Sequence, residues 1–358
     1  MKIIRLTTLL NFGGIETKMV NLSRLDDKEN EWVFVALGGG GEAEEKILAN
    51  KKQTVILGLN YRIPSLKTIW KLYKFLRKEK PDVLHTSGAE ANFFGFFAGR
   101  LARVPKVIVE EIGIPAQSST AKRIFGFIFK NADWAVGESK VVVEHFVSTY
   151  HLNPSKTKVI PNFGLFEYDL ATINIVKEEG LFNILMISRL EKIKNIEAVI
   201  NVMARLIKST SRNLRLTIAG SGVLDKELKE KVTELKLQNT VCFLGFITDP
   251  YPILRTADLY LLNSHSEGFS NSLVEALYSA TPSMSTTVGA AADIIEDHKN
   301  GFLIPVNDEE ALHLHLLKVL DISSEEMAEI GIRGQMSIVE KYSLDNHINQ
   351  LMSIYTSI

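Results

Sequence analysis

The chain has 358 residues, of which 46% are hydrophobic and 23% are charged, and its formal net charge is −1. This composition excludes an intrinsically disordered chain, and the length is sufficient for two domains. The single cysteine, Cys242, excludes a disulfide framework and zinc sites built from several cysteines, as expected in a reducing cytosol. All apolar runs are shorter than the roughly 18 residues of a membrane-spanning helix, and the opening MKIIRLTTLLNFGG fits a first strand and loop rather than a cleavable signal.

Charge is divided unevenly between the two halves. Residues 1–165 contain 24 Lys and Arg against 16 Asp and Glu, whereas the remainder contains 17 against 26. A basic front half predicts contact with an anionic partner. The alternative is that two solvated surfaces differ in charge without a functional cause.

Apolar runs and amphipathic segments alternate along the chain. The first half predicts strands and helices in turn, at 32–37, 65–80, 82–86, 90–103, 106–111, 120–131 and 139–149. The second half predicts further strands at 182–188, 214–220, 240–245 and 259–263. Strands separated by helices predict α/β domains with doubly wound parallel sheets. Residues 161–180 show no apolar periodicity, so we place the domain boundary and a hinge near 165–178.

Three loops of the second half follow predicted strands and suit a nucleotide diphosphate, since ligands of such sheets bind beyond the carboxyl ends of strands. In SRLEKIKN (188–195), Arg189 and Lys194 are candidate phosphate-binding cations; the alternative is a pair of solvated cations. In AGSG (219–222), Gly220 and Gly222 would let the backbone approach a ligand. In LGFITD (244–249), Phe246 would present an aromatic edge to a nucleobase, or the segment is a plain strand exit.

A fourth loop, SEGFSNSLVEA (266–276), combines a turn, a helix start and two carboxylates. The turn and the first helical N–H groups would form an anion site from residues Gly268, Phe269, Ser270, Asn271 and Ser272. Glu267 and Glu275 would accept hydrogen bonds from vicinal hydroxyls of a sugar and a ribose. The alternative is that Ser270 or Asn271 caps the helix and that both glutamates are solvated.

The segment 266–308 resembles the signature of the family 4 retaining glycosyltransferases. The similarity consists of Glu, seven residues, Glu, then an Ala-rich helix, a Thr-Pro turn and an Asn-Gly-hydrophobic segment. ISRLEKIKN, LTIAGSG, NFGGIETKMVNLSRL (11–25) and VIPNFG (159–164) also resemble segments of that family, in the same order. The resemblance therefore extends over nearly the whole chain.

This resemblance implies the GT-B fold, in which two Rossmann-like doubly wound domains face each other across a cleft. The N-terminal acceptor-binding domain would occupy 1–165 and the nucleotide-sugar-binding domain 178–340. The segment 341–358 would form a helix that crosses back to the first domain.

The resemblance also implies roles for individual residues. Arg189 and Lys194 would neutralise the leaving diphosphate. Glu267 would contact the transferred sugar and Glu275 the ribose, while Phe269 and Ser270 would donate backbone N–H groups. Gly13 and Gly14 would lie beneath the phosphates from the other domain.

The chain departs from the family where many members have a His-Gly segment after a strand. Here the sequence is EEIGIP (110–115), so Glu110 is the expected catalytic carboxylate on the acceptor side. His85, at a predicted strand end, is a second candidate base, although a histidine with satisfied hydrogen bonds there is an equal alternative. No Asp-x-Asp metal motif follows a strand, so we expect neither a metal nor another cofactor.

The first half contains two candidate membrane segments. YRIPSLKTIWKLYKFLRKEK (61–80) carries seven cations, and AKRIFGFIFKNADW (121–134) places Phe125 and Phe127 beside Lys122 and Arg123. Aromatic and cationic side chains together suit the interface of an anionic bilayer. The alternative is that the apolar residues pack on the sheet.

The expected activity is retaining transfer of a hexose or N-acetylhexosamine from a nucleotide sugar, with UDP as the expected nucleotide. The acceptor would be a glycan or a polyprenyl-diphosphate-linked sugar of surface-polysaccharide synthesis, reached from the cytoplasmic face of the membrane, with no nucleic acid as partner. Two alternatives are a GT-B nucleotide-sugar epimerase or hydrolase and a non-catalytic nucleotide-sugar-binding subunit. A dinucleotide-dependent oxidoreductase is disfavoured because no Gly-x-Gly-x-x-Gly follows the first strand.

Overall fold

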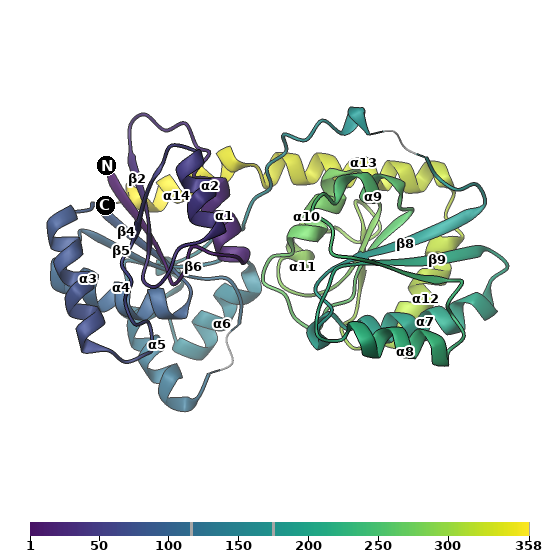
Figure 1. The fold of residues 1–358 in the computed structure, drawn as a ribbon, viewed down its shortest axis with the longest axis horizontal. Helices are drawn as coiled ribbons and strands as arrows, with labels where there is room; N and C mark the ends of the chain where they lie inside the picture. The colour runs from purple at the N-terminus through teal and green to yellow at the C-terminus, as the bar shows by residue number, and fades with distance from the viewer. Residues whose placement is uncertain (115–116, 174–175, 358) are drawn as a thin grey trace. The chain divides into compact units, whose positions relative to one another are not determined.

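The computed structural model describes residues 1–114, 117–173 and 176–357 (Figure 1). The chain forms two compact units, Met1–Phe163 with Leu344–Ile358, and Gly164–Ser343. The last residue of the EEIGIP segment, Pro115, and part of the expected hinge, residues 174–175, lie outside the described residues.

The first unit contains a seven-stranded parallel sheet in the order β3-β2-β1-β4-β5-β6-β7. Its strands are β1 Lys2–Thr7, β2 Glu31–Ala36, β3 Gln53–Ile56, β4 Val83–Ser87, β5 Lys106–Glu111, β6 Trp134–Gly137 and β7 Thr157–Val159. Its α-helices are α1 Gly14–Leu22, α2 Glu42–Ala49, α3 Leu66–Glu79, α4 Ala89–Ala102, α5 Ser119–Asn131, α6 Lys140–Tyr150 and α14 Leu344–Tyr355. A short 3₁₀ turn spans η1 Pro154–Lys156.

The second unit contains a six-stranded parallel sheet in the order β10-β9-β8-β11-β12-β13. Its strands are β8 Leu181–Ile187, β9 Asn213–Ala219, β10 Val241–Gly245, β11 Leu259–Leu262, β12 Ser283–Thr286 and β13 Phe302–Ile304. Its α-helices are α7 Ile196–Ser209, α8 Asp225–Glu234, α9 Tyr251–Thr256, α10 Asn271–Tyr278, α11 Ala291–Ile294, α12 Glu309–Leu320 and α13 Ser324–Lys341, and its 3₁₀ turns are η2 Leu170–Thr172 and η3 Lys192–Lys194.

The strands and helices predicted from apolar runs and amphipathic segments are confirmed, with ends that differ by one residue at most, whereas the helix expected at 341–358 spans Leu344–Tyr355. The physical reason is that the central strands are buried on both faces and therefore appear in the sequence as continuous apolar runs, such as Leu185 and Ile218 with their neighbours. Residues close in the sequence also define where helices begin. The side chains of Ser65, Ser118 and Ser139 cap the N-termini of α3, α5 and α6.

Strand order reverses beside the first strand of each sheet, between β1 and β4 in the first unit and between β8 and β11 in the second. At such a point the loops that follow the two strands leave in opposite directions and open a crevice at the carboxyl edge. The loops after these four strands are therefore where each unit would bind a ligand.

Candidate functional site

The loops that follow β8 and β11 contact each other at the reversal point of the second sheet. The backbone N–H of His265 donates to the carbonyl of Ile193 at 2.8 Å. Beside this contact, Lys194 Nζ donates to Glu267 Oε1 at 2.5 Å, and Ser264 Oγ donates to the same oxygen at 2.7 Å. The two charged side chains are only 15% and 13% exposed. Two of the residues predicted from the sequence are thus brought together as a partly buried ion pair.

Arg189 lies elsewhere. Its side chain is 70% exposed and its Nη1 donates to Glu191 Oε1 at 2.7 Å. The two predicted phosphate-binding cations therefore have different carboxylate partners, and their convergence on a phosphate stays a prediction.

Gly220 and Gly222 allow the loop after β9 to pack against the loop after β8. Gly220 has φ 139°, and a Cβ there would clash with the carbonyl oxygen of Ser188, whereas one at Gly222 would clash with the backbone of Leu190. This loop contact explains the need for small residues, and approach to a ligand stays a prediction. Phe246, after β10, is 67% exposed.

The turn before α10 ends in a side-chain cap. Ser270 Oγ accepts a hydrogen bond from the backbone N–H of Leu273 at 3.4 Å, so Ser270 is the N-cap and Asn271 the first helical residue. Ser272 Oγ accepts from the hydroxyl of Tyr260 at 2.7 Å. The capping alternative is thus correct for Ser270, but one side chain satisfies only one of the free N–H groups of a helix start.

The loop after β12 supports the same turn. The N–H of Ala290 donates to the carbonyl of Gly268 at 2.9 Å, and Gly289, with φ 51°, packs where a Cβ would clash with the backbone of Gly268. The ring of Phe269 lies 6.0 Å from that of Tyr342. The backbone of this turn is therefore held in place by its own unit.

Glu275 differs from Glu267 in having no partner. The structure shows no hydrogen bond or ion pair for its carboxylate among the residues that it describes. Burial and then the charge of Asp249 raise the pKa of Glu275 to about 7. A half-ionised, partly buried carboxylate without a donor is one that a ligand hydroxyl would stabilise.

At the carboxyl edge of the first sheet, Glu110 lies in a buried charge cluster. Its carboxylate accepts hydrogen bonds from Arg5 Nη2 at 2.9 Å, Lys18 Nζ at 2.6 Å and Ser87 Oγ at 2.6 Å. The side chains of Arg5 and Glu110 are 0% exposed and that of Lys18 is 1% exposed. Such a cluster is stable only because each charge has a partner.

The cluster extends to both sides of Glu110. Lys18 Nζ also pairs with Glu138 Oε1 at 2.9 Å, and Arg5 Nη1 contacts the hydroxyl of Tyr355 at 3.1 Å and His85 Nδ1 at 2.6 Å. It therefore connects β1, α1, β4, β5 and α14.

The expected roles of Glu110 and His85 do not fit these positions. Burial alone would raise the pKa of Glu110, but Lys18 and Arg5 outweigh it and hold the pKa well below the ordinary value. Burial and the nearby charge of Arg5 lower the pKa of His85 to about 3. Both side chains are 0% exposed, so neither faces an acceptor, and a carboxylate with so low a pKa is a weak proton acceptor at neutral pH.

Glu111, the next residue on β5, was missed by reasoning from the sequence. Successive side chains of a strand point to opposite faces, so Glu111 lies outside the ion pairs of Glu110. It accepts a long hydrogen bond from Asn92 Nδ2 at 3.4 Å. Burial, then the charges of Glu110, Glu90 and Glu138, raise its pKa to about 8 despite that bond. The only available signal was a pair of glutamates at a strand end, which does not say which one is paired.

Gly13 and Gly14 begin α1 at the reversal point of the first sheet. Gly13 has φ 154°, where a Cβ would clash with the Glu16 carboxylate, and Gly14 faces open space. Thr8 Oγ1 donates to Glu90 Oε2 at 3.3 Å across the same point. Contact of these glycines with phosphates stays a prediction.

The candidate membrane residues of α5 divide between two faces of the helix. Lys122 and Arg123 are exposed and Phe127 is 54% exposed, but Phe125 is 6% exposed and belongs to the core. Residues two apart on a helix differ by about 200° in direction. The expected membrane contact of Phe125 is therefore wrong, and Ile124, 36% exposed, lies beside Phe127 instead.

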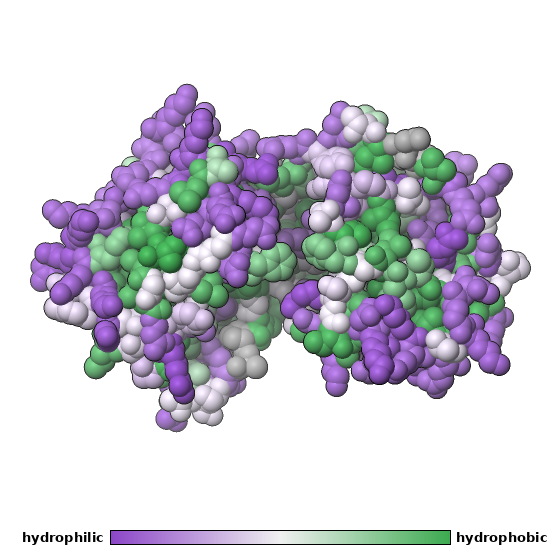
Figure 2. All heavy atoms as spheres, in the orientation of Figure 1, coloured by the Kyte–Doolittle hydropathy of each residue, from purple (hydrophilic) through white to green (hydrophobic). Residues whose placement is uncertain are grey.

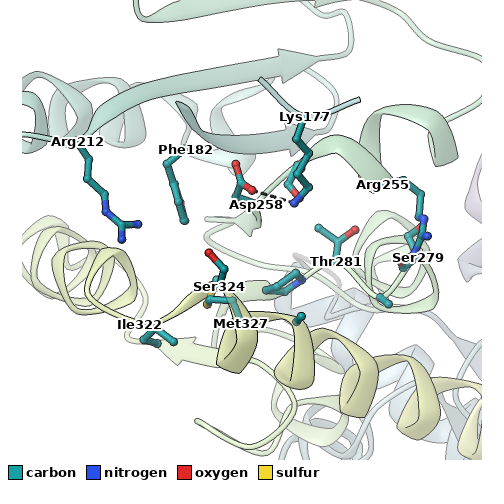
Figure 3. Close-up of a pocket in the computed structure, with 14 residues that line it drawn as sticks. Lys177, Phe182, Arg212, Arg255, Asp258, Ser279, Thr281, Ile322, Ser324 and Met327 are labelled. Atoms are coloured by element: carbon teal, nitrogen blue, oxygen red, sulfur yellow. Dashed lines mark hydrogen bonds and ion pairs between the residues drawn. The ribbon is translucent and has the colours of Figure 1, made fainter. Parts of the chain in front are cut away.

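A cavity of ≈ 320 Å³ opens at the opposite edge of the second sheet, next to the first residues of its strands (Figure 3). Arg212 and Arg255 line it, together with Lys177, which pairs with Asp258 at 2.9 Å. This is the amino edge of the sheet, away from the loops that unite Lys194 and Glu267, so it is not the candidate site. Within the described ranges, no group of three or more His, Cys, Asp or Glu is arranged to hold a metal ion.

Two family descriptions match the chain in succession. The family "Glycosyltransferase Family 4" matches residues 12–163 and "Glycosyl transferases group 1" matches residues 172–335. The chain belongs to glycosyltransferase family 4. Each matched range lies within one unit, and the Lys194–Glu267 pair lies inside the second range.

Relatives of this glycosyltransferase include two bacterial enzymes. One is the Escherichia coli "UDP-Gal:alpha-D-GlcNAc-diphosphoundecaprenol alpha-1,3-galactosyltransferase", 25% identical over 82% of this chain and 80% of its own length. The other is the Campylobacter jejuni "GalNAc-alpha-(1->4)-GalNAc-alpha-(1->3)-diNAcBac-PP-undecaprenol alpha-1,4-N-acetyl-D-galactosaminyltransferase", 29% identical over 90% of this chain and 89% of its own length.

Solved structures similar to this glycosyltransferase establish its fold. Anabaena Alr3699/HepE, determined with UDP, superposes with a TM-score of 0.84 at 20% identity over 100% of both chains. A glycosyltransferase from Rickettsia africae superposes with a TM-score of 0.85 at 19% identity, over 99% of this chain and 97% of its own. The fold, two Rossmann-like units, is GT-B.

Proposed function

We propose that this protein transfers a hexose or N-acetylhexosamine, with retention, from a UDP-sugar to a lipid-diphosphate-linked glycan. The observation that supports this most is the Lys194–Glu267 pair at the reversal point of the second sheet, in the turn that leads to the N-terminus of α10. A cation and a helix start suit a diphosphate, and a carboxylate suits sugar hydroxyls. The two bacterial relatives are named for transfer to undecaprenol-linked diphosphates, one of them from UDP-galactose, and HepE was solved with UDP.

In this proposal, donor binding exchanges the partners of the ion pair. The diphosphate carries more charge than Glu267 and takes Lys194, which leaves the Glu267 carboxylate to accept hydrogen bonds from the sugar. Because both side chains are already partly buried, little further ordering is required of them. Glu275, for whose carboxylate the described residues provide no donor, would accept hydrogen bonds from both ribose hydroxyls, which would stabilise its buried charge.

The chemical step is front-face substitution at the anomeric carbon. The bond from that carbon to the leaving phosphate oxygen breaks with its electron pair on the diphosphate, where Lys194 stabilises the new charge. The bond to the acceptor oxygen forms on the same face, and the acceptor proton passes to the leaving phosphate oxygen. No protein base is required, which agrees with the buried positions of Glu110 and His85.

The test is a thermal-shift comparison of UDP-, GDP- and dTDP-sugars, followed by transfer to a polyprenyl-diphosphate-linked N-acetylhexosamine. We expect a UDP-sugar to raise Tm most, an α-linked product from an α-linked donor, and full activity in the presence of EDTA. Turnover of the donor at an equal rate without acceptor would instead indicate an epimerase or hydrolase. Binding of the donor without turnover of any kind would indicate an accessory subunit.

We further propose that the enzyme reaches its acceptor as a peripheral protein on the cytoplasmic face of the membrane. Within the described chain, no helix has both the length and the apolarity to cross a bilayer. The first unit offers exposed Phe127 and Ile124 beside Lys122 and Arg123 on α5. Figure 2 shows hydrophobic residues among hydrophilic ones on the visible face of this unit. Absence of binding to anionic vesicles in a flotation assay would refute this part of the proposal and leave the activity untouched.

A further inference from the structure

A cavity of ≈ 220 Å³ lies between α1 and α2 in the first unit. The two helices pack on each other, and Figure 1 shows them side by side. The loop after β1 and the first turn of α2 contribute to its lining, so the cavity opens at the carboxyl edge of the first sheet. Because α1 connects β1 to β2, the cavity lies on the β2 side of β1, next to the reversal point between β1 and β4.

The mouth of this cavity is held in place by backbone hydrogen bonds. The N–H of Leu10 donates to the carbonyl of Gly39 at 3.0 Å, which ties the loop after β1 to the loop after β2. The N–H of Ala43 donates to the carbonyl of Asn11 at 3.1 Å, and a Cβ at Gly41 would clash with the side chain of Asn11. The rim is therefore ordered before any ligand binds, which lowers the entropy cost of binding.

Three polar side chains that line the cavity are available to a ligand. Within the part of the chain that the structure describes, the side chains of Asn11, Glu16 and Asn21 make no hydrogen bond or ion pair. A carboxylate accepts hydrogen bonds, and a carboxamide both donates and accepts them. Together these side chains offer both kinds of partner that a hydroxyl group requires.

The charges that line the cavity are balanced. Lys46 Nζ pairs with Glu42 Oε1 at 2.6 Å, and Arg24 and Glu16 add one charge of each sign. A lining without excess charge gives no attraction for an ion of either sign. The cavity therefore suits a neutral ligand rich in hydroxyl groups better than a diphosphate.

An aromatic ring completes the lining. Phe12 borders the cavity and is 74% exposed, so its ring is open to a ligand. One face of a pyranose ring consists of C–H groups, which pack on an aromatic ring while the hydroxyls reach polar side chains around it. The volume of ≈ 220 Å³ is below the roughly 300–1,000 Å³ of pockets for drug-sized ligands, so it suits one sugar residue.

Two glycines lie between this cavity and the reversal point of the first sheet. Gly13 lines the cavity, and Gly14, the first residue of α1, faces open space. An oligosaccharide would therefore pass over this backbone without meeting a side chain. With its terminal sugar at the reversal point, its next sugars would reach the cavity.

We propose that the cavity between α1 and α2 binds an internal sugar of the acceptor, one that does not receive the transferred sugar. The preferred acceptor is then a lipid-linked oligosaccharide rather than a single lipid-linked sugar. This inference rests on the glycosyl transfer proposed above and specifies its acceptor.

The double variant F12A/N21A removes the aromatic ring and one carboxamide from the cavity. Phe12 is mostly exposed and Asn21 partly exposed, and alanine is favourable within α1, so we expect the fold to be kept. The matched control is Trp70→Ala, which removes a 55% exposed aromatic ring of α3 from the same unit, outside the cavity. Equal Tm values of the three proteins would verify the fold.

The experiment is steady-state transfer, with the donor identified by thermal shift, to two polyprenyl diphosphates. One carries a single N-acetylhexosamine and the other carries three sugar residues. We expect wild type to have a kcat/KM about 10-fold higher for the three-sugar acceptor, through a lower KM, because an internal sugar contacts no reacting atom. F12A/N21A should bring the ratio of the two kcat/KM values close to one, and Trp70→Ala should keep the wild-type ratio.

Every other outcome contradicts the inference. A wild-type ratio close to one would show that no internal sugar is bound, while the proposed glycosyl transfer would stand. A ratio that F12A/N21A retains, or that Trp70→Ala lowers equally, would show that this cavity does not bind the internal sugar. If wild type transfers to neither acceptor, the proposed function fails and this inference fails with it.

Discussion

The two sheets reverse their strand order at corresponding points, but they place charge there in opposite ways. In the first unit, Arg5, Lys18 and Glu110 are almost completely buried and bind one another. In the second, Lys194 and Glu267 form one pair at the rim of the loops, and the carboxylate of Glu275 has no partner among the residues that the structure describes. The first arrangement is closed to ligands, whereas the second has a cation and two carboxylates that a ligand would engage.

This difference shows that a charged residue at the carboxyl end of a parallel strand has two possible uses. Inside the fold, the loss of one member of a buried pair leaves the other without compensation, so the expected effect is on stability. At the rim, the side chains of Lys194 and Glu267 keep some exposure to solvent, so the expected effect is smaller on stability and larger on ligand binding and catalysis. The four predictions below test this division.

The largest effect is expected for Lys194→Ala. If Lys194 stabilises the leaving diphosphate, kcat should fall by about 10²- to 10³-fold, with little change in Tm. Lys192→Ala, in the same 3₁₀ turn but exposed, is the matched control and should retain activity. Steady-state kinetics with the donor identified by thermal shift would decide, and unchanged turnover of Lys194→Ala would remove the proposed mechanism.

Glu110→Gln should lower the free energy of unfolding by about 3–5 kcal/mol, because Arg5 and Lys18 would keep their buried charges without this counter-ion. Glu267→Gln should lower it by less, because the side chain of Lys194 keeps some exposure to solvent, and it should reduce activity. Urea unfolding of both variants measures the contrast. Equal losses of stability in the two variants would show that the charges at the two reversal points contribute to stability in the same way.

Glu111→Gln should change the pH dependence of stability. The pKa of Glu111 is raised to about 8 in the folded protein, above the ordinary value of 4.5, so the folded state holds a proton that the unfolded state releases. Wild type should therefore lose stability relative to Glu111→Gln as pH rises from about 4.5 to 8, by a few kcal/mol. The measurement is the free energy of unfolding of wild type and of Glu111→Gln at pH 5 and at pH 8. An equal change between the two pH values in both proteins would contradict this prediction.

The smallest effect is expected for the pH dependence of donor binding through Glu275. Because the pKa of Glu275 is about 7, its carboxylate is protonated as pH falls from 8 to 6 and accepts ribose hydroxyls less well. We expect KM for the donor to rise by up to about 10-fold in wild type over this range, and a high, pH-independent KM in Glu275→Gln. A wild-type KM that does not vary with pH would show that Glu275 does not bind the ribose.

Local patterns were sufficient to predict the strands, the helices and the loops that follow them. For 61–80, expected as a membrane segment, Leu72 and Leu76 are buried, so the alternative of packing on the sheet holds for these two residues. Phe125 and Phe127 on α5 were expected to act together, although they point in different directions. The acceptor-side role expected for Glu110 rested on the resemblance, because EEIGIP takes the place of the family's His-Gly segment. The sequence contained no sign that Arg5 and Lys18 would approach it from positions more than 90 residues away.

The sequence by itself determined where the chain is extended, where it is helical and which loops follow strands, because these depend on neighbouring residues and on periodic burial. Only the tertiary structure decided which of the similar charged residues are buried and which remain open. That outcome depends on desolvation and on partners far apart in the chain, as with Lys194 and Glu267, which are separated by 73 positions. The ionisable groups of the two units therefore look alike in the sequence and differ in the fold.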